Sequence, residues 1–100
     1  MAYTPGVRVS WDPAKNLANR RKHGLSFEEA ARLFSADYLI VFDEAHSQEE
    51  DRFIGIGPVR SELIVVVWTE EDEKEARIVS ARRATTRERA LYDAYRGRKP

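Results

Sequence analysis

Residues 38–83 contain four segments typical of β-strands, and only short polar stretches separate them. Because these connectors are too short for crossover helices, successive strands should pair antiparallel. The run Leu63–Trp68 is apolar at every position, which predicts a central strand that is covered on both faces. This half of the chain therefore predicts an antiparallel sheet, with strands at Tyr38–Phe42, Arg52–Ile56, Glu62–Thr69 and Ala76–Arg83.

A short strand and a helix are predicted near the start of the chain. Val7–Trp11 alternates between apolar and polar residues, as a strand does. Asp12 followed by Pro13 is typical of a helix start, because the carboxylate caps the first turn and proline needs no N–H there. Gly24 is a natural helix end, so the first helix should run to about Lys22.

The next segment predicts a second helix with one buried stripe. Ser26 and Glu29 have the spacing of a capping box, in which each side chain bonds the backbone of the other residue. Four apolar side chains then recur at helical spacing, which predicts that they face the core: Phe27, Ala30, Ala31 and Phe34.

A second capping box predicts a closing helix. Thr85 and Glu88 have the required spacing, and the helix should end near Gly97, leaving residues 98–100 as a flexible tail. The element order is that of an α+β domain, with two N-terminal helices, one C-terminal helix and a sheet of four to five strands. A chain of 100 residues has room for one core, so residues 1–100 should form a single domain.

Charge is distributed unevenly, although 17 basic and 17 acidic side chains balance over the whole chain. Net charge is +3 over residues 1–36, −9 over residues 37–76 and +6 over residues 77–100. Such a chain can present a positive face to a polyanion, or its acidic middle can neutralise the basic ends within the fold.

Composition excludes several classes of site. Without cysteine there can be no disulfide and no thiolate metal site, and two histidines are too few for us to expect a histidine-built one. We therefore expect neither a metal nor a cofactor. The longest apolar run is far too short to cross a membrane, and the first residues lack a signal-peptide pattern, so we expect a cytoplasmic protein.

Two basic clusters suggest an anion site. Arg77, Arg82 and Arg83 lie in one predicted strand, and Arg20–His23 forms a second cluster far away in the sequence. The planar guanidinium fork suits phosphate groups, although a solvated edge strand would also carry arginines. The two clusters could be halves of one site.

Strand alternation limits which arginines can act together. In a regular strand Arg77 and Arg83 share one face, and Arg82 points to the other. A bulge, or the end of the strand, would have to reorient one residue before Arg77 and Arg82 could reach one substrate. Otherwise one of them is structural and pairs with a carboxylate such as that of Glu88.

The first helix carries the second cluster. Lys15, Asn19 and Lys22 share one helix face and could follow a phosphate backbone, or could form an ordinary solvated surface. His23 comes next, and histidine exchanges protons near neutral pH. It could therefore donate a proton in an acid-catalysed reaction, or simply cap the helix.

Two blocks of residues resemble the signatures of the BrnT toxins. The opening block is Trp11-Asp12-x-x-Lys15-Asn16-x-x-Asn19-x-x-Lys22-His23-Gly24, followed by Ser26-Phe27-Glu28-Glu29-Ala30. The closing block is Arg77-Ile78-Val79-Ser80-Ala81-Arg82-Arg83-Ala84-Thr85-x-x-Glu88-Arg89-x-x-Tyr92. The acidic run Glu49-Glu50-Asp51 before Arg52 is similar to a middle motif of that family. The resemblance covers roughly residues 9–95.

This resemblance implies a ribonuclease toxin with a RelE-like fold, from a type II toxin–antitoxin system. It implies a BrnA-type antitoxin partner with a ribbon-helix-helix domain, two toxins on one antitoxin dimer, and promoter binding only through the antitoxin. We expect metal-independent RNA cleavage that inhibits growth. The expected catalytic residues are Lys22, His23, Arg77, Arg82 and Glu49, and the expected RNA contacts are Trp11, Lys15, Asn19, Arg52, Arg83 and Tyr92.

Two other interpretations stay open. A non-catalytic RNA-binding module would use the same basic and aromatic side chains, because stacking and phosphate contacts serve binding and cleavage alike. A structural subunit, stable only with another chain, is the third possibility.

Overall fold

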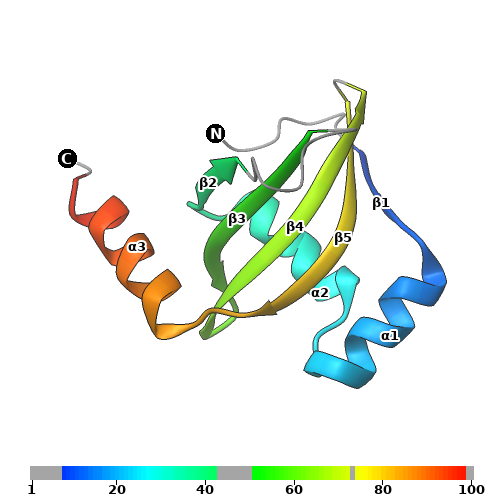
Figure 1. Ribbon diagram of the computed structural model, residues 1–100, viewed down its shortest axis with the longest axis horizontal. Helices are drawn as coiled ribbons and strands as arrows, with labels where there is room; N and C mark the ends of the chain where they lie inside the picture. The colour runs from blue at the N-terminus through cyan, green and yellow to red at the C-terminus, as the bar shows by residue number, and fades with distance from the viewer. Residues whose placement is uncertain (1–7, 43–50, 73, 99–100) are drawn as a thin grey trace.

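A five-stranded sheet forms the centre of the computed structural model, which describes residues 8–42, 51–72 and 74–98 (Figure 1). The strand order is β1-β5-β4-β3-β2. The strands are β1 (Arg8–Trp11), β2 (Leu39–Phe42), β3 (Arg52–Val59), β4 (Glu62–Asp72) and β5 (Glu75–Arg83). Glu49, Val7 and the last two residues of the expected tail lie outside the described residues.

The sheet is mixed, which corrects one detail of the predicted α+β fold. Strands β2 to β5 pair antiparallel, as their short connectors predict. Strand β1 instead pairs parallel with β5. The connector argument did not apply to β1, because most of the chain separates it from β5. The α+β class itself is confirmed.

Helix α1 (Pro13–His23) begins and ends as predicted. The Asp12 carboxylate accepts a hydrogen bond of 2.8 Å from the backbone N–H of Ala14, and Pro13 occupies the first helical position. Gly24 ends the helix in the left-handed region at φ 68°, where its N–H bonds the carbonyl of Arg20 at 2.8 Å.

The second predicted helix is short and changes its geometry. Helix α2 (Phe27–Ala30) starts with the predicted capping box and continues as a 3₁₀ helix, η1 (Ala31–Ser35). The tighter turn brings Leu33 into the core, fully buried, while Ala31 stays only half-buried. The predicted stripe is confirmed: Phe27, Ala30 and Phe34 are buried, and the half-buried Ala31 packs against the same core.

The main core lies between the sheet and the segment formed by α2 and η1. Trp68 of β4 is at its centre, with the Phe34 ring edge-on at 5.0 Å. Gly55 of β3 permits this close packing, because a Cβ there would come within 2.7 Å of Leu33 Cδ2 and 2.8 Å of Trp68 Cζ3.

Helix α3 (Thr86–Gly97) packs on part of the opposite sheet face. Its start is the predicted capping box. Asp37, just before β2, holds the helix by three contacts. The Tyr92 hydroxyl donates to the Asp37 carbonyl and the Tyr95 hydroxyl donates to Asp37 Oδ1, both at 2.7 Å. Arg96 forms an ion pair with the Asp37 carboxylate. In Figure 1, α3 lies to the left of the sheet and α1 at its lower right, beyond β5. No helix in the described part of the chain is long and apolar enough to span a membrane.

Candidate active site

Strand β5 contains a β-bulge at Val79. Val67 of β4 is paired with Ser80, but its neighbour Trp68 is paired with Ile78, so the register skips one residue. Val79 is that extra residue. A bulge of this kind shifts the side-chain alternation of every later residue in the strand.

The bulge brings Arg77, Ser80 and Arg82 to the same face of the sheet. Each of the three is opposite a residue of β4, and these β4 residues alternate along a regular strand: Thr69, Val67 and Val65, respectively. This is the face on which α3 packs, and we call it the α3 face. Of the alternatives that the sequence left open, the bulge is present, and it reorients Arg82.

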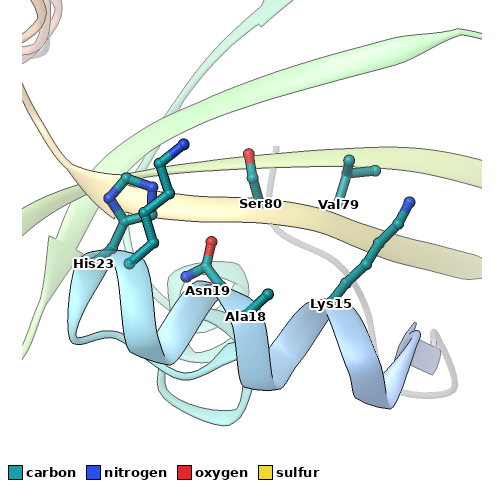
Figure 2. Close-up of a pocket in the computed structure, with 7 residues that line it drawn as sticks. Lys15, Ala18, Asn19, His23, Val79 and Ser80 are labelled. Carbon is teal, nitrogen blue, oxygen red and sulfur yellow. The ribbon is translucent and has the colours of Figure 1, made fainter.

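A pocket of about 290 Å³ opens between α1 and the bulge. In Figure 2 the side chains of Lys15 and His23 extend from α1 alongside β5, with the Ser80 hydroxyl between them. The pocket is lined by Lys15, Ala18, Asn19, Lys22, His23, Val79 and Ser80.

Ser80 therefore joins the two basic clusters. It lines the pocket with the cationic side chains of α1, and it lies between Arg77 and Arg82 on the α3 face. Sequence reasoning missed Ser80, because regular alternation puts it on the face opposite Arg77. Only the position of the bulge could have revealed it.

Asn19 has a structural role, which corrects the expectation that it donates to phosphate. Its side chain is 7% exposed, and its amide nitrogen donates to the carbonyls of Leu25 and Ala81, both at 2.8 Å. Its amide oxygen accepts from the Ala81 N–H at 3.1 Å. Both amide hydrogens are used, so Asn19 fixes α1 to the edge of β5 and has no donor left.

Arg82 forms a bidentate ion pair with Glu88. Its Nη1 and Nη2 atoms donate to the two carboxylate oxygens at 2.6 and 2.7 Å. These hydrogen bonds lower the pKa of Glu88 from 4.5 to about 2, and the same hydrogen bonds raise the pKa of Arg82. The bulge and the pairing with Glu88, which the sequence offered as alternatives, both occur.

Arg83 is used to hold the end of α1. Its Nη1 donates to the carbonyl of His23 at 2.9 Å, and its Nε pairs with Glu62 at the start of β4. These contacts give Arg83 a structural role, and its predicted contact with RNA stays a prediction. Arg83 thereby supplies a hydrogen-bond donor for the backbone carbonyl of His23 at the end of α1, and the His23 imidazole lines the pocket.

The two predicted aromatic contacts pack against the protein itself. Trp11 lies edge-on to Phe27 at 6.2 Å, at the margin of the main core. Tyr92 is 8% exposed, and its hydroxyl is bonded to Asp37. Tyr92 therefore offers no free ring for a base to stack on.

Arg52 remains on the α3 face. Both Arg52 and Arg77 are paired with Thr69 in the sheet register, so the three residues form one row across β3, β4 and β5. The predicted catalytic residue Glu49 lies outside the described residues. Within the described ranges, no three histidine, aspartate or glutamate side chains gather as metal ligands would.

The fold and the site together define a small α+β protein whose cationic pocket adjoins an arginine-bearing sheet face. The model of the family described as "Ribonuclease toxin, BrnT, of type II toxin-antitoxin system" matches residues 11–88. The chain therefore belongs to the BrnT family of ribonuclease toxins.

A solved structure supports the same fold. The Brucella abortus ribonuclease toxin BrnT is similar with a TM-score of 0.61 and 23% sequence identity. The match covers 80% of this chain and 99% of that chain. No curated protein sequence matches the chain.

Proposed function

We propose that this toxin is an endoribonuclease that cleaves RNA without a metal ion, using the pocket beside α1 and the adjoining α3 face. The observation that carries the proposal is the position of Ser80. Ser80 lines the pocket with cationic side chains of α1, and in the strand register it lies between Arg77 and Arg82 on the α3 face. A phosphate group above Ser80 would be within the combined reach of both clusters.

The spacing of the two arginines fits one phosphate. Arg77 and Arg82 are paired with β4 residues that are four positions apart, so their Cα atoms are separated by roughly 13 Å. Ser80 lies between them. Arginine side chains are long enough for both to reach a phosphate that lies between them, and Arg82 keeps two N–H groups for it beside its pair with Glu88.

The proposed reaction starts with attack of the 2′-oxygen on the adjacent phosphorus. The bond from phosphorus to the 5′-oxygen breaks, and the products are a 2′,3′-cyclic phosphate and a 5′-hydroxyl. Arg77 and Arg82 stabilise the negative charge of the phosphorane. The 2′-hydroxyl proton passes to a base, and an acid protonates the leaving 5′-oxygen; His23 and Lys22 in the pocket and Glu49 are the candidates.

As a member of a type II toxin family, the chain has an antitoxin partner. We propose that this partner is a BrnA-type ribbon-helix-helix protein, that two toxins bind one antitoxin dimer, and that the complex binds promoter DNA through the antitoxin. The toxin acts on cytoplasmic RNA, and RNA loss stops growth. The support is family membership together with a cationic site that an acidic segment can cover.

The test is cleavage of a labelled single-stranded RNA by the purified toxin in EDTA, with and without the antitoxin encoded beside its gene. We expect cleavage in EDTA, products that end in a cyclic phosphate, and suppression by the antitoxin. Cleavage that needs added magnesium would refute the mechanism. RNA binding without cleavage would favour the non-catalytic module, and an antitoxin without effect would refute the assigned partner.

A further inference from the structure

The ion pair between Arg82 and Glu88 occupies only part of the Arg82 guanidinium. An arginine has five N–H donors in fixed directions. Three are used here: Nη1 donates to Glu88 at 2.6 Å and to the carbonyl of Arg83 at 3.3 Å, and Nη2 donates once to Glu88 at 2.7 Å. The remaining two, on Nε and Nη2, have no partner among the described residues.

These two remaining donors are adjacent and parallel. The Nε and Nη2 atoms form one side of the planar guanidinium, and this side makes the same two-pronged contact with a phosphate as the end of the group makes with Glu88. The Arg82 side chain is 38% exposed on the α3 face, so the free side of the group can be reached from solution.

Glu88 is itself held in place by the start of α3. Its Oε1 atom accepts the backbone N–H of Thr85 at 2.8 Å, and its own backbone N–H donates to the Thr85 hydroxyl at 3.2 Å. The backbone N–H of Thr85 therefore fixes the carboxylate that fixes Arg82, whereas the Thr85 hydroxyl contacts only the Glu88 backbone. A free arginine would lose considerable rotamer entropy when it bound a phosphate, and this arrangement removes most of that loss in advance.

We infer that Glu88 is a positioning residue, which locks the Arg82 guanidinium so that its Nε–Nη2 side faces a phosphate of the RNA on the α3 face. This inference rests on the proposed function, because it takes RNA as the ligand. It gives α3, which is distant from the pocket beside α1, a part in substrate binding through Arg82.

The experiment is a double-mutant cycle of R82A and E88Q, measured in two ways. The first readout is kcat and KM on a single-stranded RNA in EDTA. The second is the affinity for the same RNA with 2′-O-methyl groups, which block the attacking oxygen, followed by fluorescence anisotropy. Glutamine still completes a capping box, so E88Q keeps α3 but loses the charged, two-pronged contact.

E88Q should lower kcat/KM about tenfold when Arg82 is present and have no further effect when Arg82 is already replaced. E88D, which keeps the charge on a shorter side chain, should recover part of the loss. T85A is the control: it removes the hydroxyl that caps α3 but leaves the carboxylate on Arg82. It should lower the melting temperature and change kcat/KM less than twofold.

Three results would overturn the inference. They are an E88Q variant with the kcat/KM of the parent, an equal loss of kcat/KM on E88Q replacement with and without Arg82, and a T85A variant whose kcat/KM falls as much as that of E88Q. A parent protein that binds the methylated RNA but never cleaves the unmodified one would refute the proposed reaction alone. The affinity cycle would then still decide the role of Glu88. A parent protein that binds no RNA would refute both.

Discussion

Replacement of Arg82 by alanine should separate catalysis from stability. The variant loses the two N–H groups, on Nε and Nη2, that in our proposal bind the phosphorane. Loss of one such donor typically costs 10²–10³-fold in kcat, about 2.7–4 kcal/mol of transition-state stabilisation. Loss of the ion pair with Glu88 costs far less, because both partners are partly exposed, at 38% and 20%, and such pairs contribute roughly 1 kcal/mol or less.

Arg83→Ala is the matched control, because it removes the same charge at the next position. Arg83 is turned towards the His23 carbonyl and Glu62, so this variant should lose some stability but less than tenfold in cleavage. The assay is initial-rate RNA cleavage at saturating substrate, with urea unfolding of both variants. R82K should recover activity only in part, since a lysine cannot make a two-pronged contact.

The reasoning would be refuted by an R82A variant that is folded and cleaves RNA like the parent. The transition-state contact would then belong to another residue, with Arg77 the better candidate. An equal loss of cleavage in R82A and R83A would also refute it, because that result would reflect the loss of positive charge rather than a directed contact.

Two further predictions concern stability. Gly55→Ala should cost about 1–3 kcal/mol of unfolding free energy, because the new Cβ would overlap Leu33 and Trp68. Gly97→Ala is the control: a Cβ there has no atom within 4 Å, so the unfolding free energy should change by less than about 0.5 kcal/mol. Equal shifts of the urea midpoint in the two variants would contradict the packing argument. In the folded protein the pKa of Glu88 is lowered from 4.5 to about 2. The stabilisation of the fold by the Glu88 carboxylate is therefore complete above pH 4.5 and disappears as the pH falls towards 2. The stability difference between the parent and E88Q should therefore shrink over that range, and a difference independent of pH would contradict the pKa.

The sequence predicted the local elements well because their signals are local. The cap at Asp12, the helix end at Gly24 and both capping boxes each depend on residues within one helical turn. The antiparallel order of β2 to β5 followed from short connectors in the same way. The parallel pairing of β1 with β5 and the 3₁₀ geometry of η1 were not predicted, since both depend on packing against parts of the chain far away in the sequence.

The candidate site was predicted less well, for the same physical reason. Residue type identified Arg82 and Lys22 as candidates, but exposure and free donors depend on the tertiary neighbours of each side chain. The side-chain amide of Asn19 is hydrogen-bonded to the backbone of Ala81, which is 62 residues away, and Tyr92 is buried against the segment before β2. No pattern in the first helix alone distinguishes an asparagine that binds phosphate from one that binds a strand edge.

The bulge at Val79 determines whether the cations can act together. Without the bulge, Arg82 would lie on the sheet face that carries the main core, while Arg77 would stay on the α3 face. Ser80 and the pocket beside α1 would then not lie next to both arginines. The extra residue follows directly after Ile78, the last residue of β5 that pairs with β1. Beyond that point β5 has a free edge, so it can accommodate an irregularity, and α1 lies along that edge through Asn19. The bulge therefore puts Arg82 on the same face as Arg77. It occurs where β5 meets α1, the helix that carries Lys15, Lys22 and His23, and this is why two basic segments far apart in the sequence can contribute to one site.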